Sequence, residues 1–177
     1  MNWEDKFKIV NSCLATNEEI EQDFYLKDIG ASNAAISLIQ QKYLFLPQDY
    51  VDFLLVTDGA DIAQCRFFSS AEHVRASEIY SEVYPKESWF VFGAESGGDP
   101  LLIDRAGKVV IGVGKSYSGE FKFLANSFSD FLSEVIMGPR YPIIFGIKES
   151  EFPEFIKEEE KEDPWLSFLI ERKWLVI

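Results

Sequence analysis

The chain of 177 residues is 47% hydrophobic, and this length and composition predict one globular domain with a sizeable core. Its 30 acidic residues against 17 basic ones give a formal net charge of -13, which disfavours nucleic acid and anionic membranes as partners and favours a basic protein. Solubility alone would also account for such a charge.

The cysteines and the N-terminal sequence bear on the compartment in which the protein acts. Cys13 and Cys65 lie far apart and outside any C-x-x-C motif, which favours reduced thiols. Residues 1–6 lack the apolar core of an export signal, and no apolar run approaches the roughly 20 residues that span a membrane. We therefore expect a cytoplasmic protein.

The N-terminal third of the chain predicts three helices. The first covers residues 2–14, where apolar residues recur at helical intervals, and an acidic loop over residues 17–28 follows it. Ser32 can cap the second helix. Pro47 suits the first turn of the third helix, because a proline there loses no hydrogen bond, and Gly59 would end it.

The middle of the chain is typical of β-structure. A strand is expected around residues 62–68, and Ser69 or Ser70 could cap a short helix after it. Runs of aromatic and β-branched residues then alternate with short turns, which predicts strands over residues 89–93, 101–104, 109–113 and 121–124. Successive strands joined by short turns favour an antiparallel meander.

The C-terminal part predicts two more helices. Residues 128–137 have the apolar spacing of an amphipathic helix. We expect residues 1–138 to form the α+β domain and residues 139–177 an extension, in which an acidic spacer over 158–163 leads through Pro164 into an apolar helix. Docking of this helix on the same domain is favoured because free aromatic side chains would aggregate, and docking on a partner is the alternative.

Several motifs together resemble the SMI1/KNR4 superfamily, also called SUKH. The opening signature is met by Leu46-Pro47-x-x-Tyr50-x-x-Phe53-Leu54 and Asp58-Gly59, with aspartate where the superfamily usually has asparagine. The later pattern is met by Trp89, Phe92-Gly93, Gly97-Gly98, Leu102-Ile103-Asp104 and Ser127-Phe128-x-x-Phe131-Leu132. The resemblance covers roughly residues 30 to 137. It implies one α+β domain with an antiparallel sheet flanked by helices.

Motifs of catalysis and metal binding are weak in this sequence. His73 is the one histidine, Cys13 and Cys65 show no ligand spacing with it, and we expect it on a helix surface or partly buried. Gly114-Lys115-Ser116 resembles the end of a P-loop, but Val109 stands where the first glycine should be. The sequence therefore predicts no catalytic residue, no metal and no cofactor.

The resemblance also implies a function. Bacterial members of the superfamily resemble immunity proteins of polymorphic or contact-dependent toxin systems, which bind and neutralise a cognate toxin, often a nuclease. A basic nuclease would suit the negative charge of this chain, which would steer the two together. The alternatives are a regulatory or scaffold protein without a toxin partner, as eukaryotic members resemble, and a hydrolase with paired carboxylates.

Charge and turn position give a first prediction of the partner-binding residues. Acidic residues of the loops and turns would face a basic toxin, with one aromatic residue as an anchor at the centre of the contact. The acidic candidates are Asp58, Asp61, Glu95, Asp99 and Asp104, and the aromatic candidates are Trp89 and Tyr117. The sequence leaves the toxin's chemistry and the oligomeric state open.

Overall fold

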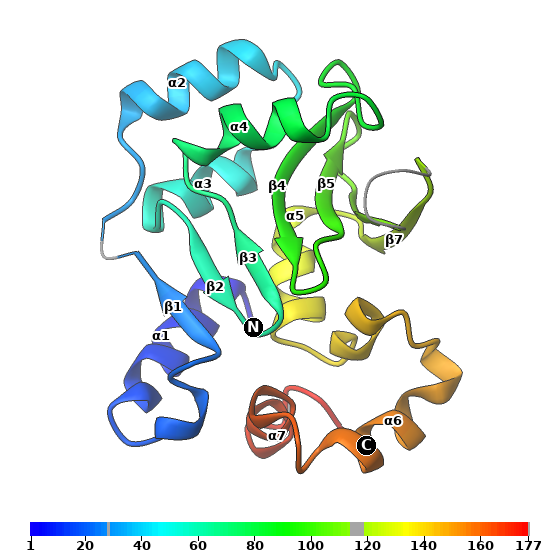
Figure 1. Ribbon diagram of the computed structural model, residues 1–177. Helices are drawn as coiled ribbons and strands as arrows, with labels where there is room; N and C mark the ends of the chain where they lie inside the picture. Colours follow the sequence, from blue (N-terminus) through cyan, green and yellow to red (C-terminus); the bar gives the residue numbers. More distant parts are fainter. Residues whose placement is uncertain (28, 114–118, 177) are drawn as a thin grey trace.

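The computed structural model describes residues 1–27, 29–113 and 119–176. These residues form one seven-stranded antiparallel sheet in which each strand pairs with the next along the chain (Figure 1). The strands are β1 (Phe24–Leu26), β2 (Ala60–Ile62), β3 (Cys65–Phe67), β4 (Trp89–Glu95), β5 (Pro100–Asp104), β6 (Val109–Gly112) and β7 (Phe121–Ala125). The predicted α+β fold with an antiparallel meander is confirmed.

Helices pack against this sheet and extend beyond it at its lower end in Figure 1, where α6 and α7 lie. The α-helices are α1 (Trp3–Leu14), α2 (Asn33–Lys42), α3 (Gln48–Val56), α4 (Glu72–Ile79), α5 (Phe128–Asp130), α6 (Phe152–Glu159) and α7 (Pro164–Glu171). Four further turns are a π-helix, η2 (Phe131–Ile136), and the 3-10 helices η1 (Glu18–Ile20), η3 (Tyr141–Phe145) and η4 (Glu149–Glu151).

Alternation along the strands buries both faces of the sheet, because successive side chains point to opposite sides. One face, with Phe90, Ile103 and Ile111, joins the main core that α1, α3, η2 and α7 complete. The other face forms a smaller cluster in which Val91, Leu102 and Val110 pack with Tyr84 and with Ala76 of α4. The sheet is therefore the middle layer between two unequal apolar clusters.

The third predicted helix, α3, begins at Pro47 as predicted, but it ends at Thr57, two residues before the predicted Gly59. Pro47 is its N-cap, and the buried side of the helix holds Tyr50, Val51, Phe53 and Leu54. Thr57 ends the helix and donates a hydrogen bond of 2.6 Å from its hydroxyl to the carbonyl of Gly59. Gly59 has φ +104, a conformation that residues with a Cβ rarely adopt.

Two predictions for the first half of the chain are wrong. The acidic stretch at 17–28 is more than a loop, because β1 lies within it and pairs with β2. The single strand expected around residues 62–68 is a hairpin of β2 and β3, with Ala63 at φ 52 in its turn. A strand of three residues is too short to show the alternation of apolar and polar residues that identifies a strand in a sequence. Such strands are recognised only by their backbone pairing with neighbouring strands.

The helix expected over residues 128–137 also differs, because most of it is the π-helix η2. Met137 donates its backbone N–H to the carbonyl of Leu132, at 3.0 Å, in place of the carbonyl of Ser133 four residues back. The ammonium of Lys6 takes the Ser133 carbonyl instead, at 2.7 Å, and also donates to Met137 O at 2.5 Å. A buried lysine of α1 therefore satisfies the carbonyls that the wider helix leaves open.

The C-terminal helix α7 contributes to the main core. Trp165 is buried, stacks on Phe24 of β1 at 5.8 Å between ring centroids, and donates from Nε1 to the carbonyl of Ile136 at 2.9 Å. Helix α6, which the sequence analysis did not predict, precedes it and overlaps the predicted acidic spacer over 158–163 only at its last two residues. The division into residues 1–138 and an extension stays a prediction.

Candidate protein-binding site

Two hairpin turns meet at one end of the sheet. The backbone N–H of Ser96, in the turn between β4 and β5, donates at 2.8 Å to the carbonyl of Gln64, in the turn between β2 and β3. Cys65, the first residue of β3, pairs with Glu95, the last residue of β4. The two turns meet because alternate turns of an antiparallel meander lie at the same end of the sheet. Asp99, just before β5, belongs to the second of these turns.

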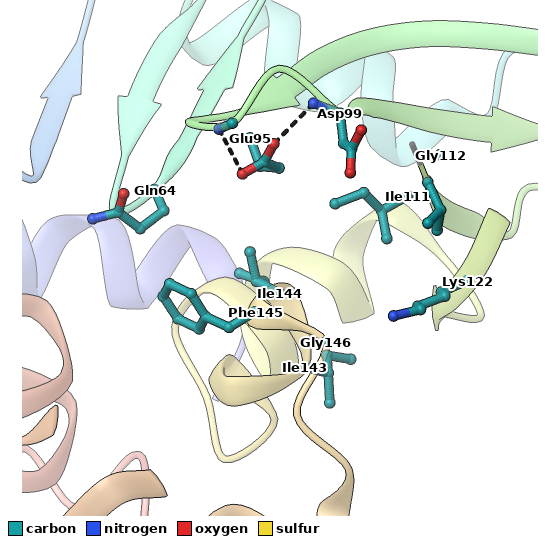
Figure 2. Close-up of a pocket in the computed structure, with 12 residues that line it drawn as sticks. Gln64, Glu95, Asp99, Ile111, Gly112, Lys122, Ile143, Ile144, Phe145 and Gly146 are labelled. Carbon is teal, nitrogen blue, oxygen red and sulfur yellow. Dashed lines mark hydrogen bonds between the residues drawn. The ribbon is translucent and has the colours of Figure 1, made fainter. Parts of the chain in front are cut away.

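A cleft of about 440 Å³ lies between this sheet end and η3. Figure 2 shows the carboxylate of Asp99 and the ammonium of Lys122 pointing into it from the sheet, with Ile144 and Phe145 on the opposite wall. We call it the acidic cleft, and its principal residues are Glu95, Asp99, Lys122, Ile143, Ile144 and Phe145. The cleft thus combines an acidic wall with an apolar one.

The carboxylate of Glu95 is held in place by the turn that follows it. Its Oε2 accepts the N–H of Gly97 at 2.7 Å, and its Oε1 accepts the N–H of Asp99 at 2.8 Å (Figure 2). Gly98 closes the turn with φ +96, a conformation that suits glycine. Each oxygen keeps a second lone pair, so Glu95 is an oriented acceptor that pays no further ordering cost on binding a donor.

A second hollow of about 330 Å³ adjoins the acidic cleft, since Gln64 and Glu95 line both. Asp61 of β2 is exposed and lies in this second hollow, opposite Arg66 of β3 in the strand register. Arg66 makes an exposed ion pair with Glu72 at 2.5 Å. The structure therefore brings three of the five predicted acids, Asp61, Glu95 and Asp99, to adjoining hollows.

The other two predicted acids lie at the opposite end of the sheet and support loops. Asp58 precedes β2 and accepts the N–H of Ser70 at 2.5 Å and its hydroxyl at 2.9 Å. Asp104 ends β5 and accepts the N–H groups of Ala106 at 2.8 Å and Lys108 at 2.9 Å. The fold does not bring either residue to the acidic cleft, and both carboxylates organise the local backbone.

The aromatic candidates have different outcomes. Trp89 is half-buried and packs edge-on against Phe121 of β7, with ring centroids 5.0 Å apart. Phe121 and Phe123 are themselves 51% and 47% exposed on the last strand of the sheet. Tyr117 lies outside the described residues. The alternation of Phe121 and Phe123 around Lys122 is the sequence signal that these two rings share one face of β7.

Groups near the acidic cleft register its negative charge. Burial is the main cause that raises the pKa of the Tyr80 hydroxyl, and Asp99 and Glu95 raise it further. Burial likewise raises the pKa of the Cys65 thiol, with Glu95 as a second cause. The smaller cause of each shift is the negative charge of these carboxylates, and the same charge would attract a cation.

Lys122 supplies positive charge at the same place. A Cβ atom on Gly146 would lie 3.2 Å from Lys122 Nζ, so the ammonium reaches across to the end of η3. Lys122 would repel a cation that enters the cleft, whereas Glu95 and Asp99 would attract it. Neither Lys122 nor the apolar residues of η3 were predicted, because nothing in the sequence near position 145 indicates that it faces the turn after β4.

The described residues contain neither a metal-binding cluster nor a membrane-spanning helix. Within residues 1–27, 29–113 and 119–176, no group of three or more histidine, cysteine, aspartate or glutamate side chains is arranged to hold a metal ion. Across the same described part of the chain, none of the helices has both the length and the apolar character needed to cross a bilayer.

Comparison with known protein families places the chain in one of them. The sequence model of the SMI1/KNR4 family (SUKH-1) matches residues 30–134, which is more than half of the chain. A search of curated proteins found no match. The matched residues run from the loop before α2 to η2. They include every strand except β1, and they also include Glu95 and the turn that follows it. The chain therefore belongs to the SMI1/KNR4 family (SUKH-1).

Proposed function

We propose that this protein is a non-enzymatic immunity protein of the cytoplasm that binds and neutralises a cognate toxin of a polymorphic or contact-dependent toxin system. The toxin is a basic nuclease. Family membership supports this proposal, since the SMI1/KNR4 family is known for immunity-type proteins. The net charge of -13 supports a basic partner, because opposite net charges steer association and raise its rate.

One observation carries the proposal from the family to this chain. Asp61 comes from β2, and Glu95 and Asp99 come from the hairpin of β4 and β5, yet all three line two adjoining hollows at one sheet end. A basic nuclease exposes lysine and arginine residues that contact phosphates, and a surface of this kind would cover them. Neutralisation then requires only a tight complex that keeps nucleic acid away from those residues.

The test is co-expression of the protein with the product of the adjacent gene. We expect the two to co-purify, the complex to weaken as salt is raised, and the protein to restore growth of cells that express the toxin. A protein that neither co-purifies nor restores growth would be a regulatory or scaffold protein instead, and its charge would then serve solubility.

The contact surface is tested by charge reversal. We expect Asp61→Lys to slow association with the toxin, because the exposed carboxylate lies beside the acidic cleft. Asp52→Lys is the matched control, since Asp52 is also exposed and lies on α3 outside both hollows. Equal association rates for the two variants would remove Asp61 from the interface.

A further inference from the structure

The acidic cleft has two walls of different origin. The wall with Glu95 and Asp99 lies within residues 30–134, which match the family. The wall with Ile143, Ile144 and Phe145 belongs to η3, which lies beyond the matched residues. The acidic half of the cleft is therefore part of the family domain, and the apolar half is supplied by the segment that follows it.

The apolar wall is firmly supported. Ile144 is buried, and the ring of Phe145 is flanked by Tyr141 and Phe155, each with its ring centroid 5.3 Å away. Phe145 nevertheless remains 41% exposed and is one of the residues that line the cleft. A rigid, partly exposed aromatic ring is suited to contact a flat or apolar group of a partner.

From this arrangement we infer that the acidic cleft receives an arginine side chain of the toxin. Glu95 and Asp99 would accept hydrogen bonds from the guanidinium group, and Phe145 would contact its flat side. This inference rests on the proposed function for the identity of the partner. It adds that the partner contributes an arginine, that this arginine binds in the acidic cleft, and that η3 helps to select the partner.

Three features favour arginine over lysine as the occupant. A guanidinium group has five N–H donors in a plane and can serve two carboxylates together, while an ammonium acts as a point charge. Glu95 is already oriented by two backbone N–H groups, so its free lone pairs have fixed directions. The 41% exposure of Phe145 favours a planar cation, because a guanidinium group can also contact an aromatic ring.

The experiment uses a blocked peptide as the probe, so that it does not depend on the toxin. The full-length protein, labelled with ¹⁵N, is titrated at low salt with acetyl-Gly-Arg-Gly-amide while its amide resonances are followed. We expect the largest shifts at Gly97 and Asp99, whose N–H groups donate to Glu95, and at Gly146 beside η3. Shifts that centre elsewhere would overturn the inference.

Two peptides with one changed side chain are the chemical controls. The citrulline peptide has the shape of the arginine peptide without its charge. We expect its affinity to be lower by a factor of about ten or more. The lysine peptide keeps the charge without the planar donors, and we also expect weaker binding. Equal binding of citrulline would overturn the role of charge, and equal binding of lysine would overturn the assignment to arginine.

Protein variants locate the binding. Glu95→Gln should abolish the peptide shifts, whereas Asp104→Asn should leave them unchanged, although each residue supports a turn through two backbone N–H groups. Phe145→Ala should weaken binding through loss of the apolar wall. Lys122→Gln should tighten it by removing a like charge, which is a gain that impaired folding cannot produce.

The same variants separate this inference from the proposed function. Growth rescue that is lost in Glu95→Gln and kept in Asp104→Asn would support both. If the wild-type protein bound the arginine peptide but did not restore growth, the immunity function would be rejected. The toxin would then also be rejected as the source of the arginine. Full rescue and unchanged toxin affinity in both Glu95→Gln and Phe145→Ala would reject the cleft as the contact and leave the immunity function standing.

Discussion

His73 of α4 and Tyr50 of α3 are joined by a buried hydrogen bond, with 2.9 Å between His73 Nε2 and the tyrosine hydroxyl. His73 Nδ1 lies 3.2 Å from the carbonyl of Val91, which can only accept, so the ring proton is on Nδ1. Nε2 therefore accepts from the hydroxyl of Tyr50. His73 is 2% exposed, and the expectation that it would lie on a helix surface or be partly buried is wrong.

This environment makes the folded protein sensitive to acid. Burial is the first cause that lowers the pKa of His73, to about 4 from a usual value of 6.5. A protonated ring would also present a second N–H to the Tyr50 hydroxyl in place of an acceptor. The unfolded chain binds this proton more readily, so the free energy of unfolding should fall as pH falls from about 6.5 to about 4, by about 3 kcal/mol.

Urea denaturation at several pH values measures this dependence. His73→Gln cannot titrate and is the reference, because the carboxyl groups, which are the same in both proteins, also contribute to the pH dependence of stability in acid. We expect the stability of the wild type to fall more steeply with acid than that of the variant. Parallel curves would show that His73 does not take up its proton on unfolding in this range.

Removal of the Tyr50 hydroxyl tests the same pair from the other side. Tyr50→Phe leaves Nε2 of His73 buried without a donor, and we expect a loss of about 1–3 kcal/mol in the free energy of unfolding. Tyr25→Phe removes the same atom from a side chain that is 56% exposed and should change little. Similar results for the two variants in urea denaturation would contradict the proposed direction of the hydrogen bond.

Lys6 should contribute to stability although it is a charged residue in the core. Lys6→Met keeps the chain length but leaves the carbonyls of Ser133 and Met137 without their donor, and should cost about 1–3 kcal/mol in thermal denaturation. Lys8→Met is the control, since Lys8 is exposed and pairs only with exposed Asp5 among the contacts described. An unchanged melting temperature for Lys6→Met would show that water replaces the ammonium without loss.

Trp165 tests whether the C-terminal helix is part of the folding unit. Trp165→Ala removes a fully buried ring that stacks on Phe24, and should lower the free energy of unfolding by about 3–5 kcal/mol. Phe123→Ala removes a half-exposed ring and should cost far less. If Trp165→Ala kept the wild-type free energy of unfolding in urea denaturation followed by circular dichroism, the helix would unfold independently of the domain.

Much of the fold follows from local patterns, and the exceptions have a common cause. The strands from β4 to β7 were predicted within a few residues, because aromatic and β-branched runs alternate with turns there. β1 was missed because its three residues are a strand only by pairing with β2. The π-helix was missed because the atom that fills its open carbonyl belongs to Lys6, at the other end of the chain.

The candidate site divides in the same way. The sequence by itself determined that the chain is acidic, that it carries the motifs of its family, and that carboxylates stand in its turns. Only the tertiary structure decided that Asp61, Glu95 and Asp99 share one end of the sheet while Asp58 and Asp104 support loops at the other. Local periodicity specifies which residues are buried, whereas the neighbours of an exposed carboxylate depend on strand register and on where η3 packs.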